Sequence, residues 1–325
     1  MIKCVVTGAN GFVGSAVVKR LHEMDRFVVG AVVRQGGHNF PLDVAVHSGL
    51  ELSGATDWMP ALSGVDCVIH AAARVHVMHD IAADALGKFR EINVEGTLNL
   101  ARQSAVAGVR RFVFISSIKV NGEGTAPGCP YTPDDAPAPA NPYGISKREA
   151  EQALRQLAAK TCMEVVIIRP PLVYGPGVKA NFLAMMRWLR RGIPLPLGAV
   201  TGNKRSLVAL DNLVDLIVTC LDHPGAANQT FLVSDDEDLS TAALLRRMGV
   251  ALGQPARLIP VPVSLLKLGA SIIGKPGVMQ RLCGSLEVDI GKTRELLGWV
   301  PPITVDEGLR LTAAHWATLR QASSG

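Results

Sequence analysis

Thr7-Gly8-Ala9-Asn10-Gly11-Phe12-Val13-Gly14 follows an apolar run at residues 2–6 and opens a helical pattern at Phe12. Each glycine has a separate role in a strand-turn-helix unit of this kind. The first permits a tight turn, the second lets backbone amides approach a pyrophosphate, and the third allows close helix packing. The helix N-terminus adds partial positive charge. We therefore predict a dinucleotide-binding turn, with candidate cofactor-binding residues Gly8, Asn10, Gly11, Phe12, Val13 and Gly14.

Short β-branched runs alternate with longer helical patterns on the C-terminal side of this turn. Strands are expected at 2–6, 27–33, 67–70, 111–116, 165–169 and 230–233, and helices at 12–24, 83–107 and 142–159. This alternation predicts an α/β fold with a Rossmann-type, doubly wound parallel sheet. Pro- and Gly-rich segments after Arg169 indicate a smaller, discontinuous substrate-binding domain. We predict a dinucleotide-binding domain over 1–169 and about 203–234, and a substrate domain over 170–202 and 235–325.

The composition excludes several classes of protein. Of the 325 residues 48% are hydrophobic and 19% are charged, so the chain can bury a core and is not disordered. Lys and Arg exceed Asp and Glu by 33 to 28, an excess that we take to be spread along the chain. Because aromatic residues make up only 5%, nucleic acid is not an expected partner. The six cysteines have no metal-ligand spacing, so we expect reduced thiols and no metal site.

The chain enters its first strand directly, without a signal-like segment, so a cytoplasmic location is expected. The apolar stretch at 258–274 is interrupted by prolines and Lys267 and is too short to span a membrane. A core or interface helix is favoured there, and contact with a membrane surface is the alternative.

Arg34 stands where the second strand ends, about 20 residues beyond the glycines. NAD enzymes of this architecture place an acid there to bind the ribose 2′-hydroxyl, whereas a guanidinium suits a 2′-phosphate. Arg34 therefore favours NADP(H), and NAD(H) remains open.

Tyr143 and Lys147 lie four residues apart at the start of a predicted helix, with Asn141 as its cap and Pro142 as its first residue. The lysine charge and the helix N-terminus both favour a phenolate, so we expect the pKa of Tyr143 to fall below its ordinary value of about 10. The strand at 111–116 brings Ser117 to the carboxyl edge of the sheet, where ligands of such sheets bind. If these residues meet, the proline-rich segment 121–141 that joins them is an ordered loop over a pocket.

These residues resemble the extended short-chain dehydrogenase/reductases that act on nucleotide sugars, also called the NAD-dependent epimerase/dehydratase family. The similarity covers almost the whole chain and rests on 7–14, His70-Ala71-Ala72-Ala73, Asn93-Val94-Glu95-Gly96-Thr97, Ser116-Ser117, Tyr143 with Lys147, Arg169-Pro170 and Leu297-Gly298-Trp299.

The resemblance implies roles for particular residues. Ser117 would polarise the substrate oxygen, Tyr143 would give or take its proton, and Lys147 would hold the nicotinamide ribose. Further cofactor contacts are implied for Ala71, Ala72, Ala73, Asn93 and Pro170, with Asn93 more a structural brace than a reactant. Substrate contacts to a nucleoside diphosphate are implied for Asn181, Arg205 and Arg281. A homodimer paired through helices is common in the family.

Departures from the family's patterns narrow the expected reaction. Ile118-Lys119 replaces the Asp-Glu pair of 4,6-dehydratases, and dehydration needs such an acid and base. Pro171-Leu172 and Asn121-Gly122 differ from the usual UDP-hexose 4-epimerase residues. Segments 117–123 and 169–182 resemble the 4-ketoreductases that form UDP-N-acetylquinovosamine for O-antigen synthesis.

The first expectation is therefore NADPH-dependent reduction of the C4 ketone of a UDP-4-keto-6-deoxy-N-acetylhexosamine. The enzymatic alternative is a 4-epimerase for UDP-glucose or UDP-N-acetylglucosamine that retains NAD. A third possibility is a non-catalytic NADP(H) sensor or scaffold, because a fold alone does not fix a function. Whether the sugar is carried by a nucleotide or by a lipid diphosphate also remains open.

Overall fold

A computed structural model describes residues 1–35, 40–75, 84–272 and 276–322. Its main feature is a seven-stranded parallel sheet in the order β3-β2-β1-β4-β5-β6-β9. The strands are β1 (Ile2–Thr7), β2 (Phe27–Val33), β3 (Ala45–Ser48), β4 (Cys67–His70), β5 (Arg111–Ile115), β6 (Glu164–Arg169) and β9 (Thr230–Leu232). The predicted Rossmann-type α/β fold is confirmed.

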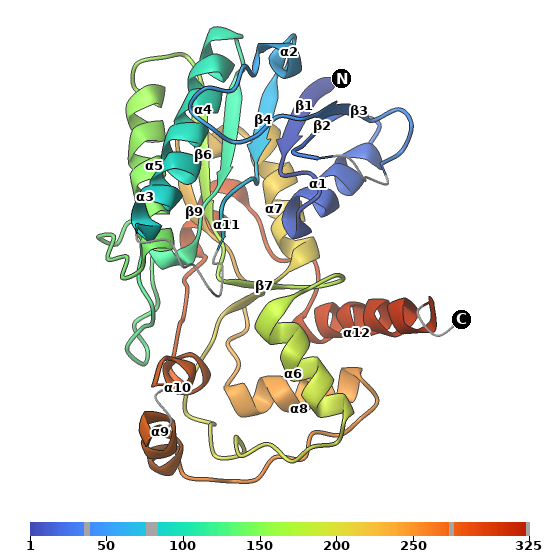
Figure 1. The fold of residues 1–325 in the computed structure, drawn as a ribbon, viewed down its shortest axis with the longest axis vertical. Coiled ribbons are helices and arrows are strands. Elements are labelled where there is room, and N and C mark those ends of the chain that lie inside the picture. The colour runs from blue at the N-terminus through green and yellow to red at the C-terminus, as the bar shows by residue number, and fades with distance from the viewer. Residues whose placement is uncertain (36–39, 76–83, 273–275, 323–325) are drawn as a thin grey trace.

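Helices cover both faces of this sheet (Figure 1). One hydrophobic cluster joins the sheet to α1 (Phe12–His22) and α7 (Leu210–Asp222). A second cluster, on the other face, joins it to α2 (Met59–Leu62), α4 (Thr97–Val106) and α5 (Pro142–Ala158). The strands read as nearly continuous apolar runs because they are buried on both faces.

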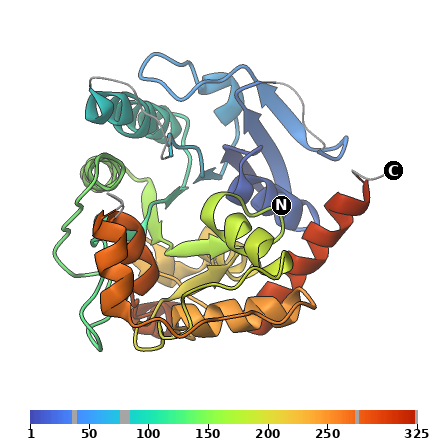
Figure 2. The same ribbon diagram turned by 60° about the horizontal axis from the view of Figure 1, so that its bottom comes forward.

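Much of the chain after β6 forms a second lobe below the sheet, which comes forward in Figure 2. It contains a two-stranded parallel sheet, β7 (Leu172–Tyr174) and β8 (Leu207–Ala209). Its helices are α6 (Ala180–Arg190), α8 (Thr241–Ala251), α9 (Val263–Ile272), α10 (Pro276–Cys283) and α12 (Val305–Ala322), while α11 (Gly291–Leu297) lies against β9. A third hydrophobic cluster holds this lobe together. The division into two domains at the residues given above stays a prediction.

All six expected strands are present. The strand expected at 230–233 is β9, which returns to the main sheet as expected and pairs there with β6. The sequence analysis missed β3, a four-residue edge strand without a buried residue. The expected helix over 83–107 is interrupted: α3 (Ala85–Arg90) leads into a π-helical turn at Glu91–Gly96 before α4 begins. Ala83 lies outside the described residues.

Candidate active site

The glycine-rich turn is built as the sequence predicts. Gly8 has a φ of +67°, a conformation that L side chains rarely adopt, and its carbonyl accepts the Gly11 amide at 2.8 Å. A Cβ on Gly14 would lie 2.2 Å from the Gly8 oxygen. Helix α1 begins after Gly11 without a capping side chain, so no side chain of the cap residue covers its first amides. The turn therefore fits the pyrophosphate of a dinucleotide.

The strand order reverses between β1 and β4, beside this turn, and open α/β sheets bind dinucleotides in a crevice at such a point. A Cβ on Gly8 would come within 2.8 Å of the Ala72 backbone, and the Ala71 amide donates to the Thr7 carbonyl at 3.3 Å. Ala71, Ala72 and Ala73 are half-buried at this edge. Because the segments around Gly8 and Ala72 approach so closely, we expect backbone groups, and not side chains, to contact a ligand here.

His70 is fully buried at the end of β4. Its ring nitrogens lie 2.6 Å from the Thr7 hydroxyl and 2.9 Å from the Thr97 hydroxyl. Complete burial, together with the charge of Lys147, lowers the pKa of His70 to about 3. A neutral His70 therefore links β1, β4 and α4. The sequence analysis quoted His70 as part of a motif but gave it no role.

The remaining predicted cofactor residues lie around this crevice. Arg34 follows β2 and is exposed. Asn10 is exposed, whereas Phe12 and Val13 are half-buried. Pro170 is buried after β6, and its carbonyl accepts the Ile118 amide at 3.0 Å, which ties the end of β6 to the turn that follows β5.

The side chains of Ser117, Tyr143 and Lys147 lie close together where β5 ends and α5 begins. Asn141 caps α5, accepting the Gly144 amide at 2.8 Å, and thereby fixes the first turn that carries Tyr143. The Tyr143 hydroxyl hydrogen-bonds with the Ser117 side chain. Lys147, one turn further on, donates from Nζ to the Ile115 carbonyl at 2.8 Å. The predicted meeting of Ser117, Tyr143 and Lys147 is thus present.

The electrostatics of this group differ from the expectation. Burial raises the pKa of Tyr143 to about 12, and only the hydrogen bond with Ser117 opposes that rise. The predicted lowering of the Tyr143 pKa was wrong, because the desolvation of a phenolate outweighs the effect of an ammonium that lies 6.0 Å from the ring centre. Burial also lowers the pKa of Lys147 to about 7, and the carboxylate of Glu151 opposes this.

A buried ion-pair network supports these residues from behind. Glu151 accepts two hydrogen bonds from Arg169, at 2.9 and 2.7 Å, and one from Ser116 at 2.6 Å. Arg169 also donates to the Asn121 side chain at 2.9 Å. The network joins α5, β5 and β6 directly below the catalytic candidates. The sequence analysis missed Glu151, although its place four residues after Lys147 puts it on the same helix face.

Asn93 connects the loop after β4 to helix α5 by hydrogen bonds. Its side chain donates to the Arg74 carbonyl at 3.0 Å and to the Ser146 hydroxyl at 3.1 Å, and it accepts the Arg74 amide at 2.7 Å. Ser146 in turn donates to the Tyr143 carbonyl at 2.8 Å. The π-helical turn at Glu91–Gly96 sets Asn93 in this position between the β4 loop and α5.

The three predicted substrate residues lie in the second lobe. Asn181 is exposed in the first turn of α6. Arg205 is half-buried, and its side chain donates to the Arg281 carbonyl at 2.9 Å. The segments that carry the two arginines are therefore in contact. Burial lowers the pKa of Arg205. Arg281 itself is exposed on α10.

The proline-rich loop at 121–141 is ordered, as predicted. The Thr125 amide donates to the Ser285 carbonyl at 2.9 Å, and the Asp289 amide donates to the Tyr131 carbonyl at 2.8 Å. The Ala138 amide returns to the Val120 carbonyl at 3.0 Å. The loop therefore bridges the nucleotide half and the segment 285–289 of the second lobe.

Residues 4–234 match the model of the NAD dependent epimerase/dehydratase family. The chain belongs to this family. Two curated relatives span nearly the whole chain. A UDP-glucose 4-epimerase of Vibrio cholerae is 50% identical over 309 residues, covering 95% of this chain and 94% of the relative. The N-acetyl-α-D-glucosaminyl-diphospho-ditrans,octacis-undecaprenol 4-epimerase of Escherichia coli O157:H7 is 27% identical, covering 96% and 94%.

Solved structures of other epimerases share the fold. UDP-glucuronic acid 4-epimerase of Bacillus cereus, in complex with NAD, has a TM-score of 0.79 at 20% identity, with 98% of this chain and 97% of that one covered. UDP-glucose 4-epimerase of Thermotoga maritima, with UDP-glucose, has a TM-score of 0.78 at 22% identity, covering 98% and 100%. The family prediction is confirmed, whereas a particular likeness to 4-ketoreductases and a preference for NADP(H) are not supported.

Neither a membrane-spanning helix nor a cluster of metal ligands is present in the described part of the chain. No helix there is long and apolar enough to cross a bilayer. No group of three His, Cys, Asp or Glu side chains in the same residues is placed to ligate a metal ion.

Proposed function

We propose that this epimerase/dehydratase family member is a UDP-sugar 4-epimerase, the alternative that the sequence analysis placed second to a 4-ketoreductase. The 50% identity over 95% of the chain to a UDP-glucose 4-epimerase supports this choice. The observation that carries the proposal is the hydrogen-bonded pair of Ser117 and Tyr143 with Lys147 one helical turn away, at the carboxyl edge of the sheet.

The side chains of the site can move one proton at the sugar O4. Tyr143 removes the O4 proton when the sugar is oxidised and returns it when the sugar is reduced from the other face. Ser117 hydrogen-bonds to both oxygens and keeps them within transfer distance. A bound nicotinamide dinucleotide supplies the redox chemistry at C4. Lys147 stabilises the phenolate, because its ammonium is held in a buried position where charges interact strongly.

We propose NAD as the cofactor. The family description and the NAD-bound relative favour it, and epimerisation leaves the dinucleotide unchanged overall. Gly8, Gly11 and Gly14 hold the pyrophosphate in this proposal, with Asn10, Phe12, Val13, Ala71, Ala72, Ala73 and Pro170 around it. Arg34 is compatible with a ribose hydroxyl as well as a phosphate, so measured affinities for NAD and NADP decide between them.

Substrate binding is proposed for Arg205 and Arg281, whose segments meet at the edge of the second lobe, and for Asn181. They would hold the diphosphate of a UDP-glucose or UDP-N-acetylglucosamine. A homodimer, a cytoplasmic location and a part in O-antigen synthesis stay predictions.

Incubation of the purified protein and NAD⁺ with UDP-glucose or UDP-N-acetylglucosamine tests the proposal, and parallel samples contain a UDP-4-keto-6-deoxy sugar with NADH or NADPH. We expect proton NMR to show the C4 epimer of at least one sugar while the absorbance at 340 nm stays constant. Consumption of one reduced dinucleotide per turnover with a UDP-4-keto-6-deoxy sugar would show a ketoreductase. Dinucleotide binding without turnover of any of these sugars would show a sensor or scaffold.

A further inference from the structure

The charges of this chain are not spread along it, contrary to the expectation from the total. Residues 165–210 and 239–286 contain 13 of the 33 Lys and Arg and none of the 28 Asp and Glu. The rest of the chain therefore carries 20 basic and 28 acidic residues. Over the whole predicted substrate domain, residues 170–202 and 235–325, there are 14 Lys and Arg and 9 Asp and Glu, whereas the nucleotide half has 19 of each. The second lobe is therefore cationic and the nucleotide half is neutral overall.

Helix α9, at the far end of the cationic lobe, is apolar on two sides. Val263, Leu266 and Ala270 face the hydrophobic cluster or are buried. Leu265, Leu268 and Ile272 recur at the spacing of the opposite face, and they are 57%, 59% and 77% exposed. A helix that is apolar on both sides normally lies inside a protein or against a lipid phase. We call these three residues the outer stripe.

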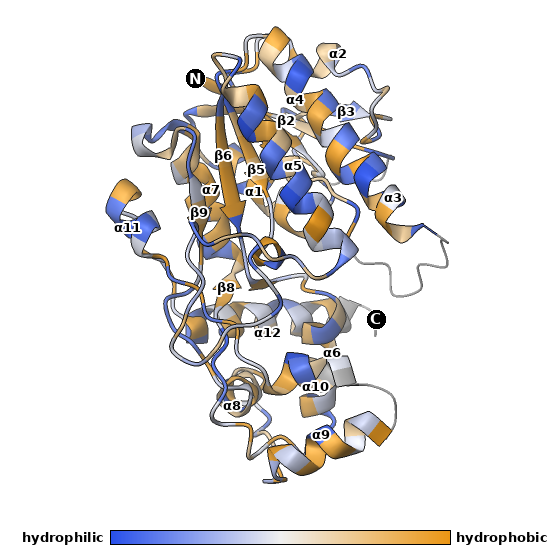
Figure 3. Ribbon diagram, turned by 90° about the vertical axis from the view of Figure 1, so that its left-hand side faces the viewer, coloured by the Kyte–Doolittle hydropathy of each residue, from blue (hydrophilic) through white to orange (hydrophobic). Residues whose placement is uncertain are grey.

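The outer stripe is at the molecular surface. Figure 1 places α9 at the lower extremity of the second lobe, where it packs against α10, and Figure 3 shows apolar residues along it. Ile259, in the segment leading to α9, is also half exposed. Residues 273 and 274 of the apolar stretch lie outside the described residues. The helix expected in this stretch is present, but a core position was wrong for its outer stripe.

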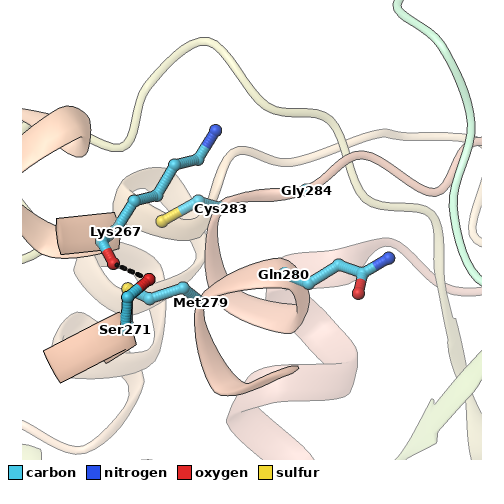
Figure 4. Close-up of a pocket in the computed structure, with 6 residues that line it drawn as sticks. All are labelled: Lys267, Ser271, Met279, Gln280, Cys283 and Gly284. Carbon is cyan, nitrogen blue, oxygen red and sulfur yellow. Dashed lines mark hydrogen bonds between the residues drawn. The ribbon is translucent and has the colours of Figure 1, made fainter. Parts of the chain in front are cut away.

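Exposed cations lie on α9 and on the segments next to it, and residues 239–286 contain no Asp or Glu. Lys267 lies on the polar side of α9, beside Ser271, whose hydroxyl donates to the Lys267 carbonyl at 3.0 Å. Both residues border a hollow of about 350 Å³ between α9 and α10 (Figure 4). Arg281 on α10 is exposed as well. Arg257 is exposed on the segment that pairs with Leu195, next to the cationic end of α6.

We propose that the outer stripe of α9 docks this protein on an anionic phospholipid surface. Aliphatic side chains would enter the boundary between headgroups and acyl chains while the surrounding lysines and arginines contact lipid phosphates. A second copy of the chain fits this face poorly, because two cationic lobes repel each other. Three side chains on a ten-residue helix also offer much less than the roughly 800 Å² per partner of a stable interface. The inference goes beyond the proposed epimerase activity and does not depend on it.

Vesicle co-sedimentation tests the proposal. The full-length protein is spun with vesicles of phosphatidylcholine alone, with vesicles that also contain phosphatidylglycerol, and without lipid. We expect it to pellet only with phosphatidylglycerol vesicles, and to do so less as the salt concentration rises. Failure to bind the anionic vesicles, or equal binding to both kinds, would overturn the proposal.

Variants locate the binding face. The double variant Leu265→Glu/Leu268→Glu should lower vesicle partitioning by about tenfold or more, and Lys267→Gln by about fivefold. Leu42→Glu, at a fully exposed leucine in the nucleotide half, is the matched control and should bind as the wild type does. Thermal unfolding and turnover of soluble UDP-sugar check that each variant is folded and active, and keep this test separate from that of the epimerase.

Two results would contradict the assignment of α9. Unchanged vesicle binding by the double variant would place the lipid contact elsewhere. A wild-type dimer that the double variant converts to a monomer in light scattering, with no vesicle binding by either, would show that the stripe is an interface between copies of the chain.

Discussion

Tyr143 must act both as an acid and as a base in the proposed reaction. Its hydroxyl is hydrogen-bonded with Ser117, and burial raises its pKa to about 12, so the phenol is protonated at neutral pH. Acting as a base requires positive charge close by, and Lys147 Nζ lies 6.0 Å from the centre of the Tyr143 ring. A raised phenol pKa therefore indicates that phenolate formation is coupled to the binding of ligands in the crevice.

Removing the Tyr143 hydroxyl should abolish turnover while leaving the fold intact. We expect Tyr143→Phe to reduce kcat for UDP-sugar epimerisation by about a thousandfold or more, because proton transfer and oxyanion stabilisation are both lost. Affinity for NAD, measured by calorimetry, should change little. Tyr131→Phe is the control, since the Tyr131 hydroxyl bonds only the Gly124 carbonyl among the described residues and lies in the loop. Equal kcat in the two variants would rule out Tyr143 as the proton-transfer group.

His70 should make the free energy of unfolding depend on pH. Its pKa is about 3 in the folded protein and 6.5 in the unfolded chain, so between these values only the unfolded chain binds the proton. Stability from this residue is present above pH 6.5 and is lost as the pH falls toward 3, at up to about 1.4 kcal/mol per pH unit. Urea unfolding at pH 7.5 and 5.5 should show wild type losing roughly 1.4 kcal/mol more than His70→Asn. Parallel losses in the two proteins would show that His70 does not resist protonation.

Only part of the candidate site could be predicted from the sequence. The spacing of Tyr143 and Lys147, and a serine at the end of the preceding strand, were sufficient to predict that the three would meet. The direction of the Tyr143 pKa shift was not predictable, because it depends on how much water the folded site excludes. Glu151 escaped notice because a carboxylate in a helical pattern usually faces solvent, and only the fold places it against Arg169.

Helix α1 depends on close packing at Gly14. A Cβ there would overlap the Gly8 carbonyl oxygen, so Gly14→Ala must push α1 away from the turn. We expect NAD affinity to fall at least tenfold and the free energy of unfolding to fall by about 1–3 kcal/mol. Gly269→Ala on α9, where a Cβ meets nothing within 4 Å, is the control and should leave both unchanged or raise stability slightly. Wild-type NAD affinity in Gly14→Ala would contradict the proposed pyrophosphate site.

Helix α5 carries Tyr143, Lys147 and the carboxylate of Glu151, which raises the pKa of Lys147. Burial lowers the pKa of Lys147, and Glu151 raises it, so Glu151→Gln should lower it further. Because activity requires the ammonium, the alkaline limb of the kcat/KM profile should move to lower pH in this variant. Arg155→Gln removes another partner of Glu151 but keeps the carboxylate charge, and should leave the limb in place. A profile that Glu151→Gln lowers in height without shifting would assign Glu151 a purely structural role.

Elements of the fold were predictable where their periodicity is strong. The central strands were located from β-branched runs, and α5 from its cap and amphipathic pattern. The π-helical turn was not predictable, because an extra residue in a helix leaves little trace in a pattern of apolar residues. The edge strand β3 was missed because none of its residues is buried, and β7 because it lies between Pro170-Pro171 and Gly175-Pro176. Its partner β8 was missed as well.

The whole molecule combines a nucleotide half that is neutral overall with a cationic second lobe. A total charge of +5 conceals this division, since it becomes visible only when the chain is divided according to the fold. A cationic lobe also suits a substrate with a diphosphate, and the long-range field would steer such a ligand toward the site. The same charge, where it surrounds the outer stripe, supports lipid contact.

The central claim is that the C4 centre of a UDP-sugar is inverted within one active site, without net oxidation. The most direct test uses UDP-glucose and UDP-N-acetylglucosamine labelled with deuterium at C4, with only bound NAD present. The account predicts that one of them is converted to its C4 epimer with the deuterium still at C4. Loss of the label to solvent during epimerisation, or failure to convert either sugar while a UDP-4-keto-6-deoxy sugar is reduced at the expense of NADPH, would contradict it.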